Sequence, residues 1–131
     1  MKELLKDIGL LLLRLVAGGT MLFSHGWDKL MSFGERMNVF PDPLGIGSSL
    51  SLGLAIFAEF GCAALLILGV TTRLVAIPLA ITMGVAYFIV HNGDAFAQRE
   101  LAFLYLGMFL SLIALGGGKF CVLKNQKFPF A

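Results

Sequence analysis

The sequence predicts an all-α membrane protein, an antiparallel four-transmembrane-helix bundle with both termini in the cytoplasm. Three observations predict this fold: 58% of the 131 residues are hydrophobic, only 14% are charged, and several stretches are apolar over a membrane-spanning length. A soluble domain carries about 25% charged residues, and at this size it buries only about two-thirds of its surface. The composition therefore argues against a soluble enzyme, a nucleic-acid-binding module and a disordered chain.

Four apolar stretches are each long enough to cross the hydrocarbon core, which takes roughly 20 residues in a helix. We expect a single domain of residues 1–131 with spans at about residues 8–30, 51–70, 74–90 and 101–115. Arg14 interrupts the first span and Glu59 interrupts the second, whereas the last two carry no charge.

The connections between these spans indicate how the spans are arranged. Residues 71–73 form so short a connection that spans two and three must be antiparallel neighbours, and residues 92–94 are a turn signal before the fourth span. The longest connection, an outer loop at residues 31–50, contains Pro41 and Pro43, which exclude a continuous helix. We expect an irregular cap at the membrane interface there.

The lysine and arginine residues outside the spans indicate the orientation, because cytoplasmic loops carry an excess of them. One side of the bundle holds six and the other three, namely Lys2, Lys6, Arg73, Lys119, Lys124 and Lys127 against Lys29, Arg36 and Arg99. Both termini should therefore face the cytoplasm, with the outer loop on the opposite side.

Arg14 and Glu59 are the charged residues deepest inside the spans, so they are the first candidates for a site. A charge at mid-helix costs ~2.5–3.5 kcal/mol on insertion scales and commonly marks function. At ~1.5 Å per residue, Arg14 lies about 10 Å and Glu59 about 20 Å above the cytoplasmic edge. We expect the two to pair in the bundle interior. Two roles stay open for the pair, a ligand or proton site and a structural staple.

Further polar residues gather toward the outer ends of the spans. Steps of three and four place Gly18, Met21, His25 and Lys29 on the same face of the first span as Arg14. We therefore predict an interior polar column that opens outward. Its candidate catalytic residues are Glu59, Arg14 and His25, and its candidate ligand-binding residues are Arg14, Lys29, Glu59, His91 and Glu100.

Five motifs follow one another along nearly the whole chain. They are R-L-V-A-G at 14–18 with S-H-G-W-D-K-L at 24–30, A-E-F-G at 58–61, L-G-V-T-T-R at 68–73, M-G-V-A-Y-F-I-V-H at 83–91, and Glu100 with G-G-G at 116–118. This series resembles the DoxX family, the DoxX/DoxD-like small integral membrane proteins. The chain departs from the family at 121–124, where C-V-L-K replaces the S-l-D that often follows the final glycines.

The resemblance implies a small multi-pass protein of the bacterial inner membrane with a link to redox metabolism. The family's namesakes are subunits of a thiosulfate–quinone oxidoreductase, and most members have no assigned activity. We expect a component that interacts with a quinone or similar lipid-soluble ligand and works with a partner oxidoreductase. Glu59 would accept a proton, and Arg14 would either hold the pair with Glu59 or donate to a carbonyl oxygen. His25 and His91 would relay protons to the outer face.

Two other functions stay open, a non-catalytic membrane anchor or assembly subunit and a carrier of protons or a small solute. The sequence lacks the inverted repeats of typical carriers, which argues against the carrier. We expect no metal, because His25 and His91 lack further ligands at a recognisable spacing. We expect no covalently bound cofactor and no nucleic-acid partner. Homo-oligomerisation and the redox activity of Cys62 and Cys121 stay open.

Overall fold

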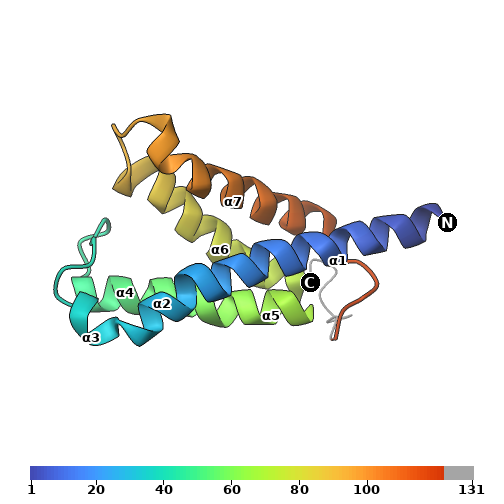
Figure 1. Ribbon diagram of the computed structural model, residues 1–131, viewed down its shortest axis with the longest axis horizontal. Coiled ribbons are helices and arrows are strands. Elements are labelled where there is room, and N and C mark those ends of the chain that lie inside the picture. The colour runs from blue at the N-terminus through green and yellow to red at the C-terminus, as the bar shows by residue number, and fades with distance from the viewer. Residues whose placement is uncertain (123–131) are drawn as a thin grey trace.

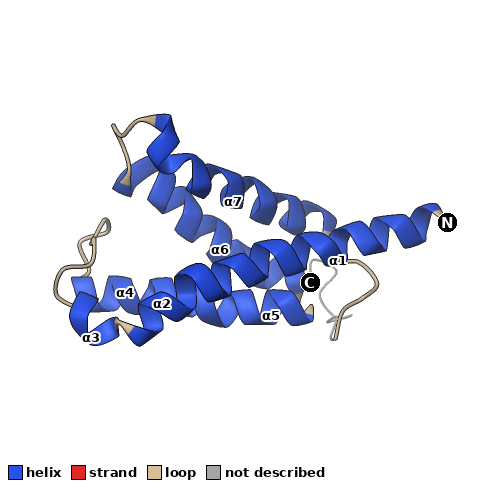
Figure 2. Ribbon diagram, viewed as in Figure 1, coloured by secondary structure: helices blue, strands red, loops and turns tan. Residues whose placement is uncertain are grey.

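The computed structural model describes residues 1–122, which form four helices long and apolar enough to cross a membrane. These helices are Lys2–Met31, Ser48–Leu68, Thr72–Val90 and Phe96–Leu115. The described residues contain no β-strand (Figure 2), so the predicted all-α four-helix architecture is confirmed. Lys124 and Lys127, which were counted for the predicted orientation, lie outside the described residues.

Three of the four spans combine α-helical and π-helical segments. The first span consists of α1 (Lys2–Met21), η1 (Leu22–Gly26) and α2 (Trp27–Met31), and the second of α4 (Ser48–Ile56), η2 (Phe57–Cys62) and α5 (Ala63–Leu68). The third consists of α6 (Thr72–Val85) and η3 (Ala86–Val90), and the fourth is α7 (Phe96–Leu115). The short helix α3 (Phe33–Arg36) lies in the connection between the first two spans.

The first and fourth spans begin earlier than predicted. They start at Lys2 instead of residue 8 and at Phe96 instead of residue 101, whereas the second and third agree with the prediction within three residues at each end. Hydropathy marks only the apolar part of a span. A helix can continue past that part into the interface, since its backbone hydrogen bonds do not depend on side-chain polarity. Pro41 and Pro43 lie outside the helices, as predicted.

The third and fourth spans pack together as a hairpin, which lies beside the packed pair of the first and second spans (Figure 1). α6 and α7 contact each other along their length, and α1 packs mainly against α5. The N-terminus and the end of α7 lie at one end of the bundle, here called the terminal end. The connection at residues 32–47 and the α6–α7 turn lie at the other, the loop end. The α6–α7 hairpin diverges from the other helices toward the loop end.

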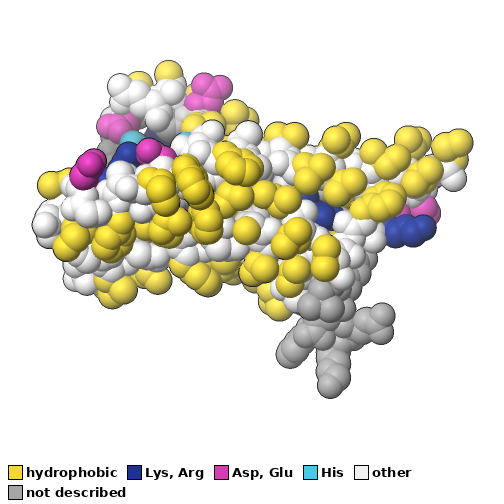
Figure 3. Space-filling view, turned by 60° about the horizontal axis from the view of Figure 1, so that its bottom comes forward, with side chains coloured by type: hydrophobic (Ala, Val, Ile, Leu, Met, Phe, Trp, Pro, Cys, Tyr) yellow, Lys and Arg dark blue, Asp and Glu magenta, His cyan; other side chains and the backbone are white. Residues whose placement is uncertain are grey.

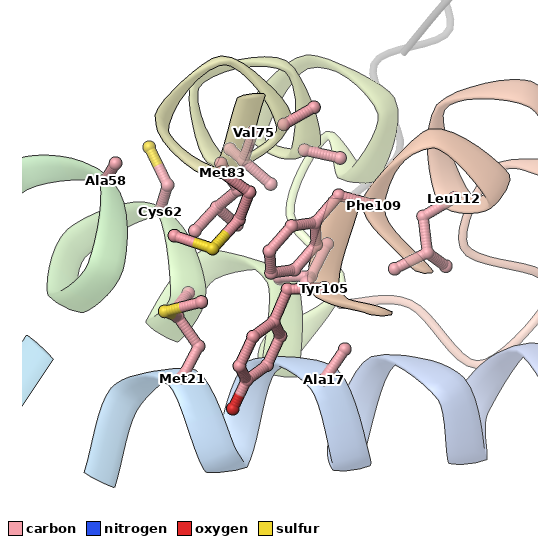
Figure 4. Packing of buried hydrophobic residues seen from close by; sticks show 14 of the residues in the cluster. Ala17, Met21, Ala58, Cys62, Val75, Met83, Tyr105, Phe109 and Leu112 are labelled. Carbon is pink, nitrogen blue, oxygen red and sulfur yellow. The ribbon is translucent and has the colours of Figure 1, made fainter. Parts of the chain in front are cut away.

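A core of buried side chains joins all four spans (Figure 4). It includes Ala17 and Met21 of α1, Ala58 and Cys62 of η2, Val75 and Met83 of α6, and Tyr105, Phe109 and Leu112 of α7. Lipid tails are as apolar as leucine, so helices in a membrane gain little by hiding apolar surface from each other. Close packing of small and large side chains therefore stabilises this arrangement.

The turn between α5 and α6 depends on the left-handed conformation of Gly69. Gly69 has φ 80° and ψ 40°, and its N–H donates to the carbonyl oxygens of Leu65 and Leu66. The N–H of Val70 donates to the same Leu65 oxygen. This pattern ends a helix without leaving its last carbonyls unpaired, and glycine adopts it at least cost. The second and third spans are therefore antiparallel neighbours, as predicted.

Candidate ligand-binding cavity

A cavity of about 540 Å³ lies at the loop end, between the first two spans and the diverging α6–α7 hairpin. Its size is typical of pockets for small molecules. Most of its wall is apolar, and its polar lining consists of His25, Lys29, Arg36, Ser51, Glu59, Thr82, His91, Gln98 and Tyr105. Figure 3 shows charged side chains and histidine gathered at this end of the molecule, next to a largely hydrophobic surface.

A partly buried ion pair lies in the wall of this cavity. Lys29 Nζ lies 2.8 Å from Glu59 Oε1, and the side chains are 16% and 4% exposed. A charged pair this far from water is stable only when its geometry is good, because desolvation costs several kcal/mol per ion. Lys29 and Glu59 therefore provide one donor group and one acceptor group at fixed positions beside an apolar space.

Gly26 brings the first span close enough to the second for this pair to form. It is buried, and an added Cβ would collide with the backbone carbonyl of Glu59. Only glycine permits so close a crossing of η1 and η2. The motif containing Gly26 was noted in the sequence, but its contact with Glu59 was not predicted.

Each of the three π-helical segments in residues 1–122 belongs to the wall of the cavity or adjoins it. His25 lies in η1 and Glu59 in η2, whereas η3 ends one residue before His91. A π-helical turn inserts an extra residue into an α-helix, shifts the side chains that follow, and occurs frequently at functional sites. These segments indicate where regular helix packing gives way to the cavity.

His25 packs against an aromatic side chain that sequence reasoning missed. The rings of His25 and Tyr105 are perpendicular, with centroids 5.6 Å apart. The Tyr105 hydroxyl donates to Thr20 Oγ1 at 2.8 Å, and the Tyr105 ring stacks on Phe109. The sequence contained one sign of this contact, a tyrosine in the middle of an uncharged span. A buried tyrosine hydroxyl usually has a hydrogen-bond partner, so Tyr105 could have been expected to contact a polar group.

The other predicted residues divide between the cavity and the surface. His91 lines the cavity and lies 3.0 Å from Asp94, from its Nδ1 to the carboxylate Oδ2. Glu100 is exposed after the first turn of α7 and does not line the cavity. His25, Lys29, Glu59 and His91 thus share one cavity, and Glu100 lies outside it.

The predicted Arg14–Glu59 pair is wrong. Arg14 is 1% exposed and donates from Nε to Leu66 O, from Nη2 to Ile67 O, and from Nη1 to Gly117 O and Phe120 O, at 2.7–3.0 Å. Helical side chains lean toward the N-terminus of their helix, so the side chain of Arg14 is directed toward the terminal end. Glu59 lies on an antiparallel span and is directed toward the loop end, where Lys29 meets it.

Arg14 therefore acts as a cap on the second span. Leu66 and Ile67 belong to the last turn of α5, where carbonyl groups run out of helical N–H donors; the Gly69 N–H reaches the carbonyl of Leu66, and Arg14 donates to the carbonyls of both residues. A cation is favourable at a helix C-terminus, where the backbone dipole is negative. The bonds to Gly117 and Phe120 also hold the segment after α7 close to the C-terminal end of α5.

The two cysteines lie in different surroundings, and both are free thiols. Cys62, the last residue of η2, is buried in the core. Cys121 Sγ lies 3.5 Å from Arg14 Nη1 and donates to Gly118 O at 3.2 Å. Among residues 1–122 no three His, Cys, Asp or Glu side chains are grouped so that they could share a metal ion.

The connection at residues 32–47 forms one wall of the cavity, and Asp42 organises it. The Asp42 carboxylate accepts bonds from the N–H groups of Gly47 and Ile46 at 2.7 and 2.9 Å and from the Ser51 hydroxyl at 2.8 Å. The Gly47 bond, followed by that from Ser51, lowers the pKa of Asp42 because both favour the charged carboxylate. The apolar side chains of this connection, Phe40, Pro41, Pro43, Leu44 and Ile46, line the cavity.

We expect Asp42→Asn to speed hydrogen exchange at the amides of Ile46 and Gly47 at neutral pH. Asparagine presents an NH2 group where one carboxylate oxygen now accepts, so a donor would face the Gly47 N–H. In the unaltered protein the bonds should persist above about pH 3.9, the ordinary value for Asp, and be lost as the pH falls through the lowered pKa. Asp94→Asn, in the α6–α7 turn, is the control. Equal exchange in the two variants would contradict this role.

Comparison with known proteins adds a family match to this geometry. A family model described as DoxX matches residues 9–92, more than half of the chain. An uncharacterized protein from Haemophilus influenzae is 34% identical over 115 residues, which cover 82% of this chain and 83% of that protein. No solved structure matches the chain. The match supports the resemblance seen in the motifs, and with the four apolar helices it indicates a multi-pass membrane protein.

Proposed function

This chain belongs to the DoxX family, and we propose that its loop-end cavity binds the head group of a quinone or a similar lipid-soluble ligand. The observation that carries the proposal is the partly buried Lys29–Glu59 pair in the wall of a largely apolar cavity. An apolar wall with a few fixed polar groups is the usual composition of a small-molecule site, in which the polar groups orient the ligand.

The Lys29–Glu59 pair suits both redox states of a quinone. A quinone oxygen can only accept a hydrogen bond, whereas a hydroquinone hydroxyl can also donate one. The Lys29 ammonium donates and the Glu59 carboxylate accepts, so one pair of side chains provides a partner for each state. Conversion between the states takes two electrons and two protons, and we propose that a partner oxidoreductase exchanges the electrons.

The proton route in this proposal runs toward the loop end. His25 and His91 line the same cavity as Glu59, and an imidazole ring can accept a proton at one nitrogen and donate one from the other. If both termini face the cytoplasm, as the lysine and arginine count predicts, the cavity faces the opposite side of a bacterial inner membrane. Protons would then be exchanged with that side through the two histidines.

Quinone binding tests the proposal directly, with the protein in lipid nanodiscs and a benzoquinone that carries one isoprene unit. Trp27, the single tryptophan, is the fluorescent reporter. We expect saturable quenching by the quinone and by its reduced form. Lys29→Met should weaken quinone binding about tenfold or more, because a hydrogen bond to a charged group is worth ~1.5–3 kcal/mol. Glu59→Gln should weaken hydroquinone binding more than quinone binding.

Glu100→Gln is the matched control for this experiment, because Glu100 is an exposed glutamate that does not line the cavity. We expect its affinity for both forms to equal that of the unaltered protein. Absence of saturable quenching in the unaltered protein would refute the proposed function. Equal losses in Glu100→Gln and Glu59→Gln would refute the assigned site.

A second candidate function, a non-catalytic anchor or assembly subunit, draws support from Arg14. This buried charge is fully engaged with backbone carbonyls of the chain's own helix end and tail, which is a structural use. An anchor would hold a partner protein at the membrane without binding a quinone. Copurification of the same partner with the unaltered protein and with Lys29→Met, together with no saturable quinone binding by the unaltered protein, would favour the anchor.

A further inference from the structure

Two side chains that line the cavity are also exposed on the surface between the second and third spans. Leu54 of α4 is 49% exposed and Ile81 of α6 is 61% exposed, and both belong to the cavity wall. A side chain that borders a cavity and is exposed at the same time lies at an opening of that cavity. The cavity therefore opens sideways between α4 and α6, where the α6–α7 hairpin diverges (Figure 1).

This side opening lies at the depth of the apolar spans. Leu54 lies six residues inside the second span from Ser48, about 9 Å along the helix axis. Ile81 lies nine residues inside the third span from Val90, about 14 Å along its axis. The hydrocarbon core is ~30 Å thick, so both side chains lie within it. The opening faces acyl chains rather than water.

Most residues near the opening are apolar; the polar ones are Ser51 and Thr82, and the charged groups are elsewhere in the wall. Ala55 follows Leu54 on α4, and Val85 is one turn after Ile81 on α6; both line the cavity. The cavity, at about 540 Å³, has room for one drug-sized head group and not for a long chain as well. A ligand with a long chain must place that chain outside.

Resting on the proposed function, we propose that the ligand carries a long apolar chain that leaves the cavity between Leu54 and Ile81 and lies in the bilayer. Its head group reaches the Lys29–Glu59 pair by the same route, without passing through water. The chain gains little by leaving lipid for an apolar groove, so the opening selects by shape rather than by hydrophobic free energy. The chemical class is therefore a membrane-dissolved long-chain molecule and not a water-soluble one.

Two benzoquinones with the same head group, one carrying one isoprene unit and the other eight, separate the head group from the chain. Their half-saturating mole fractions in nanodisc lipid are measured from the thermal midpoint of the protein, which a bound ligand raises. In Leu54→Trp and in Ile81→Trp we expect binding of the long-chain quinone to weaken at least about tenfold, ~1.4 kcal/mol. Binding of the short-chain quinone should change less than about twofold.

Leu110→Trp is the matched control, since Leu110 is 51% exposed on α7 and does not line the cavity. We expect both quinones to bind it as they bind the unaltered protein. Short-chain binding retained by Leu54→Trp shows that the variant folds. Unchanged long-chain binding, or equal losses for the two quinones, would overturn the side opening. If the unaltered protein binds neither quinone, the proposed function fails instead.

A measurement on the unaltered protein removes any dependence on folding of the variants. A diazirine placed on the second isoprene unit of the long-chain quinone should label residues of α4 and α6 near Leu54 and Ile81. Label found instead on α7 near Leu101, which also lines the cavity, would place the chain on the other side of the hairpin and overturn the proposal.

Discussion

Replacement of Arg14 by methionine should lower the free energy of unfolding by about 3 kcal/mol or more. The change leaves the carbonyl oxygens of Ile67, Gly117 and Phe120 without their donor, whereas that of Leu66 keeps the bond from the Gly69 N–H. An unsatisfied buried acceptor costs ~1 kcal/mol at the low end of the observed range. Equilibrium unfolding in mixed micelles measures the difference, and the amount of protein recovered from the membrane should fall with it.

Two further variants give this prediction its controls. Lys6→Met removes a cation from an exposed position on the same helix, and we expect its stability to change by no more than ~0.5 kcal/mol. Arg14→Lys should be intermediate, because an ammonium group donates fewer bonds and lacks the planar fork of arginine. If Arg14→Met is as stable as Lys6→Met, Arg14 is not the cap of α5.

Replacement of Gly26 by alanine should cost about 3 kcal/mol and disrupt the Lys29–Glu59 pair. The added Cβ meets the backbone carbonyl of Glu59, which cannot rotate away as a side chain could. Overpacking typically costs ~1–3 kcal/mol, and a backbone obstacle belongs at the upper end of that range. The two helices must separate, so binding at the cavity should weaken together with stability.

Gly19→Ala is the matched control, since it lies on the same helix and a Cβ there meets no atom within 4 Å. Alanine favours a helix over glycine by up to about 1 kcal/mol, so this variant should be unchanged or slightly more stable. The comparison is made by unfolding in mixed micelles and by quinone titration. A Gly26→Ala protein as stable as Gly19→Ala would mean that η1 and η2 can separate without cost.

The sequence was sufficient for the architecture because apolar length is the dominant constraint in a bilayer. The four spans, the short turn after α5 and the irregular part of the connection with its prolines were predicted, but the short helix α3 in that connection was not. The gathering of His25, Lys29, Glu59 and His91 at one end followed from helical spacing and the order of the spans. These features depend on periodicity and length, which a single sequence contains.

The partners of Arg14 and Glu59 were mispredicted because the prediction used the depth of each residue in the membrane and ignored the direction in which its side chain leans. Depth placed the two residues about 10 Å apart, within the reach of an arginine side chain. Their side chains lean toward the N-termini of antiparallel helices and therefore diverge, and the same rule directs Lys29 of α2 toward Glu59. The pairing of Glu59 with Lys29 instead of Arg14 could therefore have been inferred from the sequence. The bonds from Arg14 to Gly117 and Phe120 could not, because they depend on how the segment after α7 folds back.

The long-range bonds of Arg14 have a consequence for the synthesis of this protein. Gly117 and Phe120 follow Arg14 in the chain by 103 and 106 residues. At ~5–20 residues per second, a ribosome needs roughly 5–20 seconds to deliver them after the arginine has emerged. Leu66 and Ile67 follow after 52 and 53 residues, so the cation gains two of its four partners with the second span and the other two only with the tail. We therefore expect Arg14 to reach its final buried position only after the last helix has been made.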